Sequence, residues 1–102
     1  MHEDAPFTSR RTDDGVLALA GSISEEYAPA LLTLLLDALE EGPLTVDLTD
    51  VDYLPSVALS SFIAAWHAEG AHPMTLQARK GTISQRVLAV TALPHEELDA
   101  VE

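Results

Sequence analysis

The chain contains no cysteine among its 102 residues. This absence excludes disulfides, thiol catalysis and thiolate metal sites. Lysine and arginine are scarce, 5 against 17 aspartates and glutamates, and the formal net charge is −12. Such a charge repels phosphate backbones and anionic lipid, which argues against binding to nucleic acid or to a membrane surface. It favours a partner with a basic face, because electrostatic attraction raises the rate of association.

Long hydrophobic runs are missing as well. No apolar stretch approaches the roughly 20 residues of a membrane span, and no basic region followed by an apolar one marks a secretory signal in MHEDAPF. We therefore expect a cytoplasmic protein without membrane insertion. Hydrophobic residues make up 47% of the 102-residue chain, which suits one packed core and leaves no room for a second. Residues 1–102 are expected to form a single domain, with 1–6 frayed.

Hydrophobic periodicity predicts an alternation of strands and helices. Strands are predicted at 7–11, 16–20, 44–49 and 72–78, and helices at 22–41, 56–69 and 82–93. Asp14-Gly15 favours a tight hairpin between the first two strands, whereas strands joined through helices should run parallel. Strict alternation in the last two strands indicates that one sheet face meets water. The fold class is therefore α/β, a mixed sheet of about four strands with helices mainly on one face.

Each predicted helix carries an apolar stripe at helical spacing. The stripes are Ala28, Leu31 or Leu32, Leu35 and Leu39 in the first helix, Leu59, Phe62, Ile63 and Trp66 in the second, and Ile83, Val87 and Val90 in the third. Because Trp66 continues a stripe, core packing is favoured over an interface role for this side chain. Thr82, with Gln85 three residues on, indicates the start of the third helix.

No catalytic or metal-binding constellation can be assembled from the sequence. The four histidines share no metal-ligand spacing, and Asp47, Asp50 and Asp52 lack the glycine and terminal glutamate of a calcium loop. No glycine-rich phosphate loop is present, and no histidine is placed by the pattern to activate Ser56 or Ser60. We expect no enzymatic activity, no metal and no cofactor.

The most informative segment is 46–62, VDLTDVDYLPSVALSSF, in which an alternating strand leads through a turn into a helix. This segment resembles the signature of the STAS domain, the sulfate transporter and anti-sigma factor antagonist fold, and the plan of the whole chain is similar. The matching positions are Asp47-Leu48 at the strand end, Tyr53-Leu54 as the hydrophobic pair, Ser56 and Leu59. The resemblance implies a STAS-like single domain, and Ser56 falls where anti-sigma factor antagonists carry the serine that their partner kinase phosphorylates.

Three neighbours of Ser56 depart from the family pattern. Pro55 stands where the family has an acidic residue, Val57 where it has serine or threonine, and Ala58 where it has glycine. The helix start survives these changes. Two interpretations of Ser56 stay open: a phosphorylated regulatory serine, or a plain helix N-cap, which is worth roughly 1 kcal/mol over alanine.

The resemblance implies an anti-sigma factor antagonist. It would bind an anti-sigma factor, a serine kinase with an ATPase-type fold, through the loop and helix of 50–61, as a monomer or weak dimer. The candidate contact residues are Asp50, Asp52, Leu54, Pro55, Ser56, Val57, Ser60 and Ser61. The alternative is a non-phosphorylatable STAS adaptor subunit of a lipid-transport or signalling assembly, and a third hypothesis is a small-ligand pocket beside Ser56.

Overall fold

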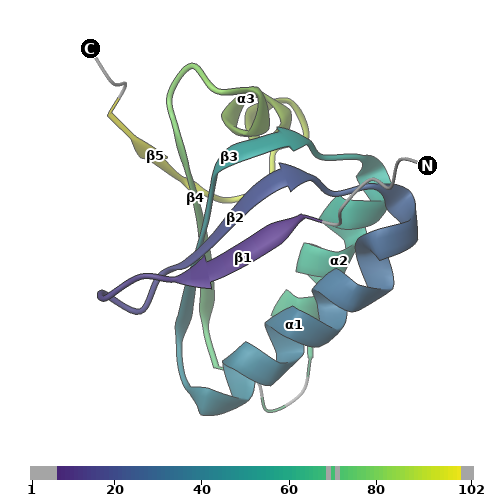
Figure 1. Cartoon of the computed structure of the whole chain (residues 1–102), viewed down its shortest axis with the longest axis vertical. Coiled ribbons are helices and arrows are strands. Elements are labelled where there is room, and N and C mark those ends of the chain that lie inside the picture. Colours follow the sequence, from purple (N-terminus) through teal and green to yellow (C-terminus); the bar gives the residue numbers. More distant parts are fainter. Residues whose placement is uncertain (1–6, 69, 71, 100–102) are drawn as a thin grey trace, which may run out of the picture.

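A computed structural model gives the structure of the chain and describes residues 7–68, 70 and 72–99, so the predicted fraying of 1–6 lies outside it. Five strands form one sheet in the order β1-β2-β3-β4-β5 (Figure 1). The strands are β1 Thr8–Arg11, β2 Leu17–Ser22, β3 Leu44–Tyr53, β4 Met74–Arg79 and β5 Glu96–Leu98. The helices are the short 3₁₀ helix η1 Glu25–Tyr27 and the α-helices α1 Ala28–Glu41, α2 Ser56–Trp66 and α3 Ile83–Val90.

The strand directions are those that the sequence predicts. β1 pairs antiparallel with β2, while β2, β3 and β4 are parallel neighbours. In the hairpin before β2, Gly15 has a φ of +85°, a conformation that costs glycine little. The amide of Gly15 donates to the Thr12 carbonyl at 2.9 Å, and the Thr12 side chain accepts from the Val16 amide at 3.1 Å.

A fifth strand corrects the prediction of about four. Glu96–Leu98 pairs parallel with β4, where the sequence indicates at most a short turn. Glutamate disfavours strands, so local propensity gives no indication of this element. Backbone and side-chain hydrogen bonds to β4 and its end hold it: Lys80 N donates to Leu98 O at 2.9 Å, and Arg79 Nη1 donates to Asp99 O at 2.7 Å.

The core lies on one face of the sheet. Alternate residues of β4 and of β3 over 44–49 are buried and their neighbours are half-buried, as the period-2 pattern predicts. α1 and α2 lie side by side over this face (Figure 1). The predicted stripe of α1 is confirmed, with Leu31, Leu35 and Leu39 fully buried. Phe62 of α2 and Leu88 of α3 join the same core.

The predicted buried stripe of α3 is wrong at Ile83 and Val90, whereas Val87 is half-buried and packs against the core as predicted. Ile83 is 59% exposed and Val90 is 80% exposed, whereas Ser84 and Leu88 are fully buried. The Ser84 hydroxyl donates a hydrogen bond to the carbonyl of Leu48 on β3. This bond satisfies a polar group inside the core, and the helix face that makes it therefore turns inward although it is less apolar.

Trp66 at the end of α2 is half-buried and packs against the core, as its stripe predicts. Its indole Nε1 donates to the carbonyl of Met74 at 2.8 Å. The ring therefore joins α2 to the first residue of β4. The start of α3 is also as predicted, since the Thr82 hydroxyl accepts from the Gln85 amide at 3.2 Å.

We expect Ser84→Ala to destabilise the domain by about 1–3 kcal/mol, because it leaves the buried carbonyl of Leu48 without the hydroxyl donor. The matched control is Ser60→Ala, which removes a serine hydroxyl that bonds to the Ser56 carbonyl on the exposed surface and should cost less than about 0.5 kcal/mol. Urea unfolding followed by Trp66 fluorescence measures both variants. Equal losses would contradict a structural role for the Ser84 bond.

Candidate functional site

The loop that joins β3 to α2 places Ser56 at the first position of the helix. Pro55 occupies the N-cap position in an extended conformation, and its carbonyl accepts from the Leu59 amide at 3.1 Å. The helix has no side-chain cap. The interpretation of Ser56 as an N-cap is therefore wrong, because Pro55 takes that position.

Ser56 is exposed, and within the described part of the chain its hydroxyl forms no hydrogen bond. Val57 beside it is 44% exposed. Ser60, one turn later, is also exposed and donates to the Ser56 carbonyl at 3.1 Å. The start of α2 thus presents a free hydroxyl next to an apolar side chain, and nothing in the fold requires that hydroxyl.

Two of the predicted contact residues do not reach the surface. Leu54 is 5% exposed and Ser61 is 6% exposed. Leu54 packs in the hydrophobic core, and the Ser61 hydroxyl donates to the Ala28 carbonyl at 3.0 Å, which joins α2 to α1. Both residues hold the helix in place, so we remove them from the set that could touch a partner.

The two acidic candidates lie on the last part of β3. Asp50 and Asp52 are exposed, and the Asp52 carboxylate accepts from the Ser22 hydroxyl at 2.7 Å. Pro55 is half-buried. With Ser56, Val57 and Ser60, these residues form the accessible part of the predicted surface.

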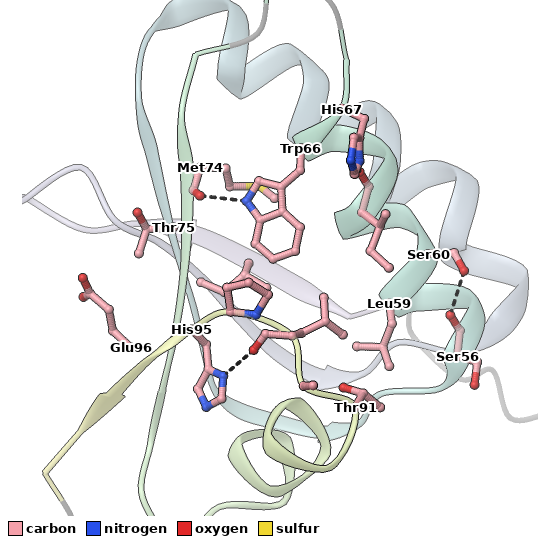
Figure 2. A pocket seen from close by; sticks show the side chains of 15 residues that line it. Ser56, Leu59, Ser60, Trp66, His67, Met74, Thr75, Thr91, His95 and Glu96 are labelled. Carbon is pink, nitrogen blue, oxygen red and sulfur yellow. Dashed lines mark hydrogen bonds between the residues drawn. The ribbon is translucent and has the colours of Figure 1, made fainter.

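A groove of about 910 Å³ begins beside Ser56 and runs along α2 (Figure 2). α2 forms one wall, the segment 91–96 that follows α3 forms the other, and β4 forms the floor. The apolar lining residues are Leu59, Ile63, Trp66, Met74, Leu76, Ala92, Leu93 and Pro94. A pocket beside Ser56 is only the third hypothesis from the sequence. The wall 91–96 is not predicted, because tertiary packing alone brings this segment to α2.

The polar side chains that line the groove are largely committed to this chain's own backbone. Trp66, His67, His95, Thr91 and Ser60 each bond to a backbone carbonyl of this chain, with heavy-atom distances of 2.7 to 3.1 Å. These bonds use the one donor hydrogen of Trp66, Thr91 and Ser60, so none of these three side chains has a second donor for a polar ligand. Within the described residues, Ser56 at the mouth, Thr75 on β4 and Glu96 on the wall line the groove without a side-chain hydrogen bond. The groove therefore offers mainly apolar surface.

Among the described residues that line the groove, only Glu96, at the end of the wall 91–96, is acidic. The 17 aspartates and glutamates all lie outside 53–68 and 81–95. The single charged side chain in these two segments is Arg86, which does not line the groove. Acidic residues stand just beyond them, at Asp50 and Asp52 before α2 and at Glu96 and Glu97 after α3. An uncharged centre with charged residues around it is the anatomy of a protein-binding surface.

Other kinds of site find no support in the part of the chain that the structure covers. Across 7–68, 70 and 72–99, no three histidine, aspartate or glutamate side chains come together as a metal site could. Over the same residues, no helix combines the length and apolar character needed to cross a membrane.

Comparison with known proteins identifies the fold. The family model described as "Mlab, STAS domain" matches residues 7–95. The structure is similar to the crystal structure of an anti-sigma factor antagonist from Mycobacterium paratuberculosis, with a TM-score of 0.66 and 24% identity over 85% of this chain and 77% of that one. No curated protein matches the chain. The predicted STAS resemblance is confirmed: this chain belongs to the STAS domain family.

Proposed function

We propose that this STAS domain is a protein-interaction module that acts as an anti-sigma factor antagonist in the cytoplasm. The observation that supports it best is the uncharged exposed face of α2 and the mainly apolar groove beside it, with the free hydroxyl of Ser56 at one end. The partner would be an anti-sigma factor with the fold of an ATPase-type serine kinase. The similarity to a solved anti-sigma factor antagonist agrees with this role.

The distribution of charge suits docking. Removing a charged group from water is costly, and a surface without charges avoids that cost when a partner covers it. All 17 acidic residues lie outside 53–68 and 81–95, and the resulting net charge of −12 for the whole chain attracts a partner with a basic face over a distance. The uncharged centre then supplies contact area, and the surrounding acidic residues supply orientation.

Phosphorylation of Ser56 would act through the same electrostatics. A phosphate adds about −1.5 to −2 charges at an exposed position of the first helical turn. The domain itself tolerates an anion there, because free amides and the helix dipole favour negative charge at a helix N-terminus. A docked partner would have to bury that charge. Docking would weaken while the fold stays intact.

A second function is favoured by the neighbours of Ser56. Pro55 replaces the family's acidic residue and fixes the N-cap, and Ala58, in place of glycine, is fully buried. Together with the family description "Mlab, STAS domain", these features support a non-phosphorylatable adaptor subunit of a transport or signalling assembly. It would dock through the same α2 surface, and Ser56 would then be a contact residue that no kinase modifies.

We expect Ser56→Asp to lower affinity for the anti-sigma factor about tenfold, which corresponds to about 1.4 kcal/mol, because it puts a carboxylate into the uncharged surface. Ser56→Ala should bind like wild type and lose less than about 0.5 kcal/mol of stability, since the hydroxyl caps nothing. Calorimetric titration measures affinity, and thermal unfolding measures stability. The matched control is Ser9→Asp, which adds the same charge on β1. Wild-type affinity in Ser56→Asp would place Ser56 outside the interface.

Intact-mass measurement after incubation with candidate anti-sigma kinases and ATP separates the two functions. The antagonist function predicts the addition of one phosphate to the wild-type chain and none to Ser56→Ala. A kinase that binds the chain without adding phosphate would support the adaptor function. Phosphate on both proteins would place the modified residue elsewhere.

A further inference from the structure

We propose that the groove between α2 and the segment 91–96 is the anchoring site for a positively charged amphipathic helix of the partner. The helix would insert apolar side chains into the groove. This inference rests on the proposed interaction function and adds to it a second contact, at Ile63 and Trp66, beyond Ser56. The inference also specifies the chemistry of the partner segment, which is apolar on one face and basic on the other.

The lining of the groove calls for apolar side chains. Leu59, Met74 and Leu93 are buried and form its deep surface, while Ile63 at the rim is 41% exposed. The sequence pattern predicts Ile63 on the buried face, and in the structure this side chain lines the open groove instead. Covering such surface releases water at a gain of roughly 25 cal/mol per Å².

The hydrogen bonds around the groove exclude an added strand as the occupant. Strand addition needs a free sheet edge. The floor strand β4 pairs with β3 over 74–77 and with β5 over 77–79, and before the β5 pairing begins the Met74 carbonyl accepts from the Trp66 indole. The polar side chains of the walls are also bonded to carbonyls of this chain. The occupant that fits this surface forms its backbone hydrogen bonds within itself and contacts the groove through side chains alone. A helix meets both conditions.

Charge decides which kind of helix fits. Glu96 is exposed on the groove wall, with Glu97 next to it, and the chain as a whole carries −12. These charges attract basic residues that flank the inserted apolar side chains. They also oppose occupation by a second copy of this chain, since two such molecules repel each other. The partner segment should therefore be rich in lysine or arginine.

The intrinsic fluorescence of the chain can report this contact. Trp66 is its one tryptophan, lines the groove and is half-buried. A helix that covers the groove takes the exposed part of the indole out of water and should shift its emission to shorter wavelength.

The test uses two tryptophan-free model helices with the same leucine stripe, one with lysine and one with glutamate at the other positions. Titrated into the full chain, the lysine helix should give a saturable blue shift of Trp66 that weakens as salt rises, and the glutamate helix should give none. Ile63→Lys should weaken binding of the lysine helix about tenfold. The matched control is Ile83→Lys, which changes an exposed isoleucine of α3 outside the groove lining and should bind like wild type.

Three results would overturn the proposal: no response to the lysine helix, equal loss in both isoleucine variants, or a wild-type dimer that Ile63→Lys dissociates. Should Ile63→Lys fail to fold, Ser60→Lys introduces the same group at another exposed position of the groove wall. Titration of the anti-sigma factor separates this proposal from the broader function. If Ser56→Asp weakens that complex and Ile63→Lys does not, the antagonist function stands and the groove contact is wrong.

Discussion

Phe62 lies fully buried in the middle of α2, and with Ala58, Leu59 and Ala65 it holds this helix against the sheet. The hydroxyl of Ser61 adds a bond to the Ala28 carbonyl of α1. Because one face of α2 is fixed in this way, the opposite face has to meet solvent. The exposed positions of Ser56 and Val57 and the open groove beside Ile63 all follow from that packing.

The exposed face of α2 differs from the rest of the surface in its chemistry. None of the 17 acidic residues lies in 53–68 or 81–95, and among the described residues that line the groove only Glu96 is acidic. The core does not require the scarcity of acidic residues here, because it is closed without the exposed side chains. The helix start does not require it either, because Pro55 occupies the N-cap. The proposed docking of a partner would account for it, because covering an uncharged surface costs little and acidic surroundings select a basic partner.

Where a single physical effect governs an element, the sequence predicts it. Period-2 alternation predicts β4 and the part 44–49 of β3 with their buried face, and helical spacing predicts the buried stripe of α1. The alternation stops at 49, so the sequence predicts a turn where β3 in fact continues to Tyr53. Prediction fails where effects compete: the Ser84 hydrogen bond turns α3 against its apolar stripe, and pairing with β4 makes a strand of Glu96–Leu98 against its propensity. The family resemblance predicts Ser56 as a candidate site residue. It does not predict the groove, because the walls of the groove are far apart in the chain and meet only through packing.

The most direct test maps the contact surface without any substitution. Backbone amide shifts of the isotope-labelled chain are recorded by NMR before and after addition of the anti-sigma factor. The account predicts that the changes cluster at the start of α2, along its face toward the groove and in the segment 91–95, while β1 and the open face of the sheet stay unchanged. Changes confined to β1 or to the open sheet face would contradict it.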